Sequence, residues 1–362
     1  MESLVKGVHH ITLCVGGAQE DVDFFTKVLG QRMVKQTVLM DGSIPIYHLY
    51  YANADVELGS VATSFPYSRK PGRAGSGQLS ATSYTVTPGT IGFWKDHLDR
   101  HKIEHSGVQE RFSQKFIRLR HPAGLLFEVV ETPNDNRKGW TTKEISADVA
   151  THGFLGAVLS VRDVRDQETF FTDALGLKKL GVDGPYHRFE VPGTGQGRYI
   201  DLHHEPDRAP GSWGFGAGTA HHIAFNLDTD DAMTKQKAWY EELGFTDCSE
   251  IKDRFYFHSM YTRSPGGILI ECTSNVPGGF YLDESPDELG TKLHLPPWYE
   301  DQRQAIVAQL EPITVPEENR PKTGQSAVPA AVVAAQAAQK SASVPESAVP
   351  LSHFQAKFGN KK

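Results

Sequence analysis

The chain has 362 residues, of which 39% are hydrophobic, 10% aromatic and 22% charged, as in an ordinary globular protein. Its formal net charge of −7 argues against nucleic acid as a partner, and no apolar run is long enough to span a membrane. The N-terminus, "MESLVKGVHH", lacks the apolar core of a signal peptide, so we expect a cytoplasmic protein. Cys14, Cys248 and Cys272 are too scattered for a disulfide framework or a cysteine zinc site, so a metal would need nitrogen and oxygen ligands.

Four runs of the sequence read as strands that open similar units, each followed by a helix-like segment. The four first strands are "HHITLCV" at 9–15, "SATSYTV" at 80–86, "LGAVLSV" at 155–161 and "HHIAFNL" at 221–227. The helix-like segments are "FFTKVLG" at 24–30, "FWKDHLD" at 93–99, "FFTDALG" at 170–176 and "AWYEELG" at 238–244. Gly30, Gly176 and Gly244 stand where a left-handed residue would end three of these helices.

Residues rich in Val, Ile, Tyr and Phe, broken by Gly and Pro turns, follow each helix and end in a last strand. The four last strands are "SVATSF" at 60–65, "LLFEVVE" at 125–131, "RYIDLHH" at 198–204 and "ILIECTS" at 268–274. Each unit therefore reads β-α-β-β-β. Such a unit cannot bury both faces of its strands alone, so we expect an α+β fold in which four βαβββ modules pair into two cup-shaped half-barrels.

Shifts in composition divide the chain into parts. Residues 66–78 and 132–153 read as linkers. We expect modules 1 and 2 in residues 5–131, and modules 3 and 4 with a C-terminal extension in residues 153–316. The composition of residues 317–362 is dominated by Ala, Val, Pro, Ser and Gln, which predicts a disordered low-complexity tail.

An alignment of the four modules shows where they differ. It places His10, Ala81, Gly156 and His222 at one first-strand position, and Thr63, Glu128, Asp201 and Glu271 at one last-strand position. Modules 1 and 4 thus supply two imidazoles and one carboxylate, with the small Thr63 in the fourth corner. Because a buried carboxylate is costly without a cation, we predict a metal site formed by His10, His222 and Glu271.

This predicted site has consequences for the metal and for the topology. Two imidazoles and one carboxylate leave three coordination positions open, which suits non-haem Fe(II) and O₂, although Mn(II) or Zn(II) would accept the same ligands. His10 can meet the other two ligands only if module 1 pairs with module 4, which leaves modules 2 and 3 to form the second cup.

At this point the sequence resembles the vicinal oxygen chelate superfamily, whose paired βαβββ units hold a metal between first-strand His and last-strand Glu. Within it, "GVHHITL", "HLYYANADVELGSVATSFPY", "HHIAF", "DRFYFHSMYTRSPGGILIECTS" and "LPPWYEDQR" are similar to the branch that cleaves hydroquinone rings. The resemblance implies an Fe(II)-dependent extradiol-type dioxygenase, with Mn(II) ranked behind Fe(II), O₂ as co-substrate and a small aromatic diol as substrate. It also implies His10, His222 and Glu271 as the ligands.

The same resemblance implies further catalytic residues, namely His9, Thr12, His221, Arg254 and Tyr261. Neighbours on a flat strand point to opposite faces, so His9 and His221 can support the ligands only where a β-bulge turns them inward. Arg254 and Tyr261 are seven positions apart, which would also place these two on opposite faces of a flat strand.

Two aromatic residues are candidates for a wall that holds the substrate ring: Phe65 in "FPY" and Trp298 in "LPPW". The remaining histidines follow no shared pattern, and we expect them at the surface or in hydrogen bonds; they include His48, His97, His101 and His105.

Other functions remain open from the residues alone. Nothing in them distinguishes a hydroquinone from a catechol, so a catechol extradiol dioxygenase is one alternative. A glyoxalase-like metal-dependent isomerase or thiol transferase would use four protein ligands, and a small-molecule binding protein would need no metal. The oligomeric state is also open, a homo-oligomer included.

Overall fold

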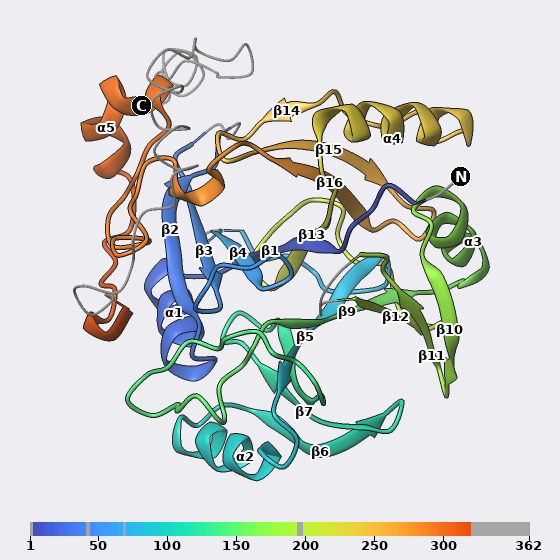
Figure 1. The fold of residues 1–362 in the computed structure, drawn as a ribbon, viewed down its shortest axis with the longest axis horizontal. Coiled ribbons are helices and arrows are strands. Elements are labelled where there is room, and N and C mark those ends of the chain that lie inside the picture. Colours follow the sequence, from blue (N-terminus) through green and yellow to red (C-terminus); the bar gives the residue numbers. More distant parts are fainter. Residues whose placement is uncertain (1–2, 41–43, 68–69, 194–197, 320–362) are drawn as a thin grey trace.

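Two curled sheets of eight strands dominate the computed structural model, which describes residues 3–40, 44–67, 70–193 and 198–319 (Figure 1). The first sheet contains β1 (Val8–Val15), β2 (Arg32–Val38), β3 (Tyr47–Ala52), β4 (Val61–Pro66), β13 (Thr219–Asn226), β14 (Lys252–Asp253), β15 (Phe257–Arg263) and β16 (Leu269–Asn275). The second contains β5 (Gln78–Val86), β6 (His105–Arg111), β7 (Gln114–Arg120), β8 (Leu126–Glu131), β9 (Phe154–Val161), β10 (Lys178–Asp183), β11 (Tyr186–Glu190) and β12 (Tyr199–His204).

The strand order confirms the predicted pairing of modules. The first sheet runs β14-β15-β16-β13-β1-β4-β3-β2, and the second runs β10-β11-β12-β9-β5-β8-β7-β6. Antiparallel pairing of β1 with β13 joins module 1 (β1–β4) to module 4 (β13–β16), and pairing of β5 with β9 joins module 2 (β5–β8) to module 3 (β9–β12). We call the concave face of the first sheet the first cup and that of the second sheet the second cup. The predicted α+β fold of paired βαβββ modules is therefore confirmed.

One main helical element follows the first strand of each module. These are α1 (Ala18–Asp23) continued by η1 (Phe24–Val28), α2 (Ile91–Arg100), α3 (Arg165–Thr169) continued by η2 (Phe170–Ala174), and α4 (Asp230–Glu242). Figure 1 shows α4 above the first sheet and α2 below the second. The predicted glycine ends of three helices are confirmed, because Gly30, Gly176 and Gly244 have φ of 64°, 67° and 91°.

Two of these helices differ from the prediction, because η1 and η2 are π-helical turns rather than α-helix. The Leu29 N–H donates to the carbonyl oxygen of Phe24 at 3.0 Å, five residues back, and Leu175 does the same to Phe170 at 3.2 Å. Both segments share the sequence "FFT", and both phenylalanines of each are buried. A π-turn is an insertion that widens one turn of a helix, and here it accompanies two consecutive rings packed into the core.

The apolar core is shared by both sheets. Along β1, Ile11, Leu13 and Val15 are buried in this core, while His10 and Thr12 alternate with them and face the first cup. Residues of both sheets and of the helices belong to one apolar cluster. The period-two pattern that predicted the strands therefore also keeps the polar positions of β1 on the concave face.

A C-terminal extension packs against β2 and contains η3 (Gly279–Tyr281), η4 (Pro297–Gln302), α5 (Arg303–Val307) and η5 (Glu317–Asn319) (Figure 1). The Met33 N–H donates to Oδ1 of Asn319 at 2.7 Å, so the extension reaches three residues into the predicted tail. The rest of that tail, 320–362, lies outside the described residues. The division of the chain at residues 131 and 153 stays a prediction, because each sheet combines one module from either side. No helix in the described segments has the length and hydropathy needed to cross a membrane.

Candidate metal centre

The structure brings His10, His222 and Glu271 together at the base of the first cup. Nε2 of His10 lies 2.9 Å from Nε2 of His222, and Oε2 of Glu271 lies 2.6 Å from Nε2 of His222 and 3.4 Å from Nε2 of His10. All three side chains are buried, with exposures of 5% or less. One atom from each residue could therefore contact a single ion.

Strand register explains why these positions meet. Each last-strand candidate pairs with the residue two positions after its first-strand partner: Thr63 with Thr12, Glu128 with Ser83, Asp201 with Val158, and Glu271 with Ala224. The four modules therefore place their candidate residues at one equivalent level, as the sequence alignment predicted. Thr63 occupies the fourth corner of the first cup, and its hydroxyl lies 2.8 Å from that of Thr12.

Two β-bulges turn the first histidine of each pair. The pairing of β1 with β13 passes from Val8 to His10 and from His222 to Ala220, so His9 and His221 have no cross-strand partner. The second sheet has bulges at the equivalent positions, Ser80 and Leu155. The bulges are thus a property of the module pair, and the condition under which His9 and His221 could support the ligands is met.

A hydrogen bond of the bulged His9 fixes the tautomer of the candidate ligand His10. Nε2 of His9 donates to Oδ1 of Asn275 at 2.9 Å, which leaves Nδ1 of His9 as an acceptor. Nδ1 of His10, 2.8 Å away, must then carry the proton, and its Nε2 presents a lone pair to the cup. His221 and His222 repeat the contact between the two rings, with their Nδ1 atoms 2.8 Å apart. This explains why the sequence twice contains a His-His pair: one ring orients the other.

Within the part of the chain that the structure describes, only one of the two carboxylate oxygens of Glu271 accepts hydrogen bonds from hydroxyl groups. Its Oε1 accepts hydrogen bonds from the hydroxyls of Ser259 and of Thr273, the latter at 3.0 Å, whereas its Oε2 has no donor among the described residues. Burial disfavours the charged carboxyl, but the electrostatic interaction with His222, then with His10, outweighs it and holds the pKa of Glu271 well below its ordinary value. An unsatisfied carboxylate oxygen beside two imidazole lone pairs fits a divalent cation, so His10, His222 and Glu271 are suited to hold one.

A chain of hydroxyls leads from this centre to a histidine that the sequence did not single out. The Thr12 hydroxyl lies 2.7 Å from Nε2 of His222, and Thr63 bonds Nε2 of His48 at 2.9 Å. Nδ1 of His48 lies 2.8 Å from the hydroxyl of Tyr50. Burial, then the nearby His10, lowers the pKa of His48 well below its ordinary value. The alternation in "YHLYY" places His48 and Tyr50 on one face and is the signal that could have found them.

A cavity of about 990 Å³ opens above the three candidate ligands. It is lined by His10, Leu39, Met40, His48, Tyr50, Phe65, Phe215, His221, His222, Ser249, Lys252, Arg254, Phe257, Tyr261, Leu269 and Glu271. Its walls are mostly apolar, and its polar groups gather near the candidate ligands and around Arg254. This combination suits a small aromatic molecule that carries hydroxyl groups.

Arg254 and Tyr261 both line this cavity, although a flat strand would have separated them. Tyr261 lies on β15, opposite Glu271 in β16, while Arg254 lies in the turn between β14 and β15, where Phe255 has a φ of 67°. The guanidinium of Arg254 lies 5.6 Å from the centre of the Tyr261 ring. Burial, then Glu271, raises the pKa of Tyr261 above its ordinary value, so its hydroxyl stays a donor.

The two aromatic candidates for the cavity wall have different locations. Phe65 lines the cavity, with its ring 5.4 Å from that of His221. Trp298 is not among the lining residues, because η4 belongs to the C-terminal extension and packs its ring 5.7 Å from that of Phe255. Phe215 also lines the cavity and was not predicted from the sequence; its ring stacks on that of His221 with centroids 3.5 Å apart.

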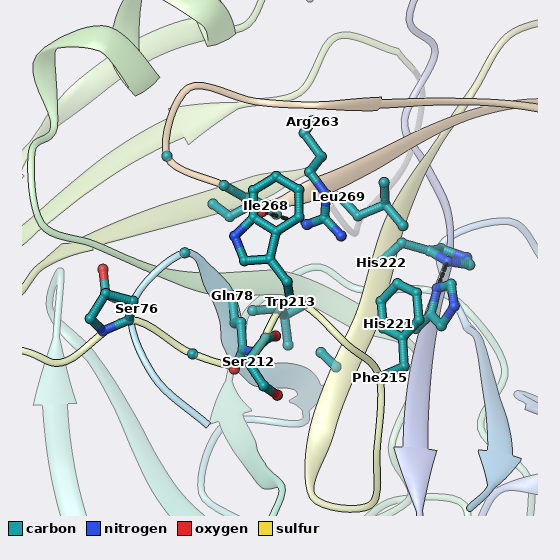
Figure 2. A pocket seen from close by; sticks show the side chains of 17 residues that line it. Ser76, Gln78, Ser212, Trp213, Phe215, His221, His222, Arg263, Ile268 and Leu269 are labelled. Atoms are coloured by element: carbon teal, nitrogen blue, oxygen red, sulfur yellow. Dashed lines mark hydrogen bonds between the residues drawn. The ribbon is translucent and has the colours of Figure 1, made fainter. Parts of the chain in front are cut away.

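A second hollow, of about 610 Å³, adjoins the cavity on the other side of Phe215, His221, His222 and Leu269. Figure 2 shows Phe215 beside His221, and Trp213 in front of Arg263. The guanidinium of Arg263 lies 4.2 Å from the centre of the Trp213 ring. The stacked pair of Phe215 and His221 therefore forms part of the partition between two hollows.

In the second cup, arginines from other strands, and not histidines, lie beside the carboxylates. Arg111 binds Glu128 through two nitrogens, at 3.0 and 2.7 Å, and Asp201 through a third at 2.9 Å. Arg188 makes two further bonds to Asp201, at 2.8 and 2.9 Å. Burial opposes the charge on Glu128, but Arg111 outweighs it and lowers the pKa of Glu128 to about 2. The carboxylates of the second cup are thus neutralised by guanidinium groups.

The chain belongs to the Glyoxalase/Bleomycin resistance protein/Dioxygenase superfamily, whose family model matches residues 7–135 and 153–272. A chlorohydroquinone/hydroquinone 1,2-dioxygenase of Sphingobium indicum is 38% identical over 316 residues, or 86% of this chain and 98% of that protein. MhqO of Bacillus subtilis, assigned as a ring-cleaving dioxygenase, is 36% identical over 88% of this chain and 99% of its own length.

Solved structures resemble the protein to different degrees. A Bacillus subtilis protein described as a dioxygenase has a TM-score of 0.82 and 35% identity, and the match covers 88% of this chain and all of that one. Glyoxalase I from Zea mays has a TM-score of 0.54 and 13% identity, covering 74% of this chain and 92% of that one. The second likeness concerns the fold alone.

Proposed function

We propose that the protein is an Fe(II)-dependent ring-cleaving dioxygenase of extradiol type that acts on hydroquinones. The observation that carries this proposal is the convergence of Nε2 of His10, Nε2 of His222 and an unsatisfied Oε2 of Glu271 at the base of a cavity with apolar walls. The sequence identity to a hydroquinone 1,2-dioxygenase supports the substrate class. In the reaction, a ring carbon–carbon bond beside a hydroxyl-bearing carbon breaks and both atoms of O₂ enter the product.

His10, His222 and Glu271 would hold the iron, which supplies open coordination positions for diol and O₂ and a path for electrons from the ring to oxygen. The chain's own residues then orient the substrate. Phe65, Phe215 and Phe257 provide apolar walls for the ring. The Tyr261 hydroxyl, which stays protonated, donates a hydrogen bond to a substrate oxygen.

Two further groups handle charge and protons in this proposal. Burial, then the neighbouring His222, lowers the pKa of His221 well below its ordinary value, so this ring stays neutral. With its Nδ1 beside Nδ1 of His222, its Nε2–H can donate a hydrogen bond to a substrate oxygen. Arg254 lines the same cavity and stabilises negative charge that develops on a substrate oxygen.

Thr63 favours this function over a glyoxalase-like one. A four-ligand site would need a second carboxylate at the position level with Thr12, where this chain has a hydroxyl. Three protein ligands leave room for both a diol and O₂. Catechol cleavage remains the nearer alternative, because a catechol fits the same donors.

Anaerobic loading with Fe(II), followed by oxygen-electrode assays on hydroquinones and catechols, tests the proposal. We expect one iron per chain and O₂ uptake that depends on a hydroquinone. Glu271→Gln should lose both, while Glu250→Gln, which changes an exposed carboxylate, should keep both. Faster uptake with catechols would reassign the substrate, thiol consumption without O₂ uptake would indicate an isomerase or transferase, and tight diol binding without iron would indicate a binding protein.

A further inference from the structure

We propose a second metal site, for zinc, on the outer surface of module 2, formed by His97, His101 and Glu144. Within the described segments, this cluster and the first-cup triad are the two groups of His, Cys, Asp and Glu whose ligand atoms all lie within 4.8 Å of one another. His97 and His101 lie four residues apart at the end of α2, with ring centroids 4.5 Å apart. Glu144 comes from the segment 132–153 that connects modules 2 and 3.

The tautomer of His97 leaves a nitrogen available to bind a metal ion. Its Nε2 donates to the carbonyl oxygen of Val28 at 3.0 Å, which leaves a lone pair on Nδ1. That lone pair faces Oε2 of Glu144 at 3.7 Å. A nitrogen lone pair and a carboxylate oxygen repel each other at this distance, and a zinc ion bound to both atoms would replace the repulsion by two metal–ligand bonds.

The distances from the Glu144 carboxylate oxygen to the two histidine nitrogens match those around a zinc ion. A tetrahedral zinc ion with bonds of about 2.0 to 2.2 Å holds neighbouring ligand atoms roughly 3.3 Å apart. Glu144 Oε2 lies 3.7 Å from Nδ1 of His97 and 2.9 Å from Nε2 of His101, which brackets that value. Two imidazoles and one carboxylate favour zinc over magnesium or calcium.

The surroundings leave the site open to solvent on one side. The side chains of His101 and Glu144 are 23% and 53% exposed and border a hollow of about 600 Å³, so water can complete the coordination. Arg100 approaches Nδ1 of His97 at 3.4 Å, and this exposed side chain can turn outward. Lys27 and Lys143 line the same hollow and oppose a cation, whereas Glu317 favours it.

Zinc here would connect three parts of the chain. His97 is bonded to η1 of module 1 and lies on α2 of module 2, and Glu144 belongs to the connecting segment. Trp94 already holds that segment through a hydrogen bond from Nε1 to the carbonyl oxygen of Val149 at 3.0 Å. A metal link would therefore stabilise the folded state by mass action, and the melting temperature would rise with zinc concentration.

Zinc stoichiometry of the full chain, together with thermal unfolding, tests the site. We expect two zinc ions in the wild type, one in Glu144→Gln, His101→Ala or Glu271→Gln, and none in the double variant Glu144→Gln/Glu271→Gln. Zinc should raise the melting temperature of Glu271→Gln but not of the double variant. His105→Ala, which removes a neighbouring ring that pairs with Asp99 instead, should keep both ions.

The outcomes separate this site from the first cup. One zinc ion in the wild type, lost in Glu144→Gln but kept in Glu271→Gln, would support the surface site and count against the metal centre of the first cup. An unchanged stoichiometry in both Glu144→Gln and His101→Ala would overturn the surface site, as would one ion in the wild type and none in Glu271→Gln.

Discussion

Nδ1 of His9 lies 2.8 Å from Nδ1 of His10 across a β-bulge, and Nε2 of His9 lies 2.9 Å from Oδ1 of Asn275. Asn275 ends β16, the strand that carries Glu271, so the far ends of the folded core are connected through one imidazole. The proton order along these bonds determines that His10 presents its Nε2 lone pair to the first cup.

Replacing Asn275 by leucine should weaken metal binding while the fold persists. Leucine removes the acceptor that fixes the His9 tautomer, and loss of such an outer hydrogen bond lowers metal affinity by roughly 10- to 100-fold. Asn275→Asp keeps an acceptor oxygen and should keep the affinity. Anaerobic titration with Fe(II), with thermal unfolding as a check on the fold, measures both variants. Equal affinities for leucine and aspartate would contradict the role of Asn275.

Removing a buried arginine from the second cup should lower the free energy of unfolding strongly and leave metal binding unchanged. Arg111→Met leaves the buried Glu128 and Asp201 with less positive charge, and breaking a buried ion pair costs about 3 to 5 kcal/mol. Urea unfolding measures the free energy of unfolding. Arg120→Met, in the same hairpin but in an exposed pair with Glu104, should cost less than about 1 kcal/mol. Iron binding should be normal in both variants. Similar losses of unfolding free energy in the two variants would show that the buried ion pairs of Arg111 do not stabilise the fold more than an exposed pair does.

A pH dependence is expected from Glu284 in the C-terminal extension. Its carboxyl lies against the buried Lys35, beside Asp283 and His294. Burial, with a contribution from Asp283, raises the pKa of Glu284 from 4.5 to about 7, although Lys35 opposes the rise. A raised carboxyl pKa means that the folded state holds the proton more tightly than the unfolded state. The stability from this group is complete below about pH 4.5 and is lost as the pH rises through about 7.

Glu284→Gln removes this titration and gives the measurement. The free energy of unfolding of the wild type, minus that of the variant, should fall by on the order of 3 kcal/mol between pH 4.5 and pH 8. Glu288→Gln, an exposed change on the same segment, should track the wild type across this range. A difference that stays constant or rises with pH would show that Glu284 has no raised pKa.

Repetition made much of the fold predictable. Four copies of one β-α-β-β-β pattern predicted the strands, and the requirement that His10 meet His222 and Glu271 predicted the pairing of outer with outer and inner with inner modules. The glycine helix ends followed from local backbone physics, since Gly30 needs a positive φ. These features depend on local pattern or on one simple contact.

Features that depend on how distant strands pair could not be predicted. The bulges at His9 and His221 arise from the register between β1 and β13, which no local pattern encodes. Phe215 reaches His221 from a loop, and Trp298 lies elsewhere because the extension packs as a unit. His48 was obscured by the number of other histidines.

Thr63 gives the sharpest test of how ligand number controls the chemistry. It is level with Thr12, as Glu271 is level with Ala224, so a carboxylate at this position would approach the same point from the opposite strand. Thr63→Glu should therefore add a fourth ligand. We expect tighter metal binding, and O₂ uptake reduced by roughly a hundredfold, because one of the three open coordination positions is then filled.

The control for this change is Thr63→Val, which removes the hydrogen bonds to Thr12 and His48 without adding a ligand. Metal affinity should be near that of the wild type in Thr63→Val and higher in Thr63→Glu, as measured by competition with a chelator. If Thr63→Glu keeps full O₂ uptake while binding metal more tightly, the number of open positions does not limit the reaction. Three protein ligands would then be no reason to expect oxygen chemistry, even with the metal bound where we expect it.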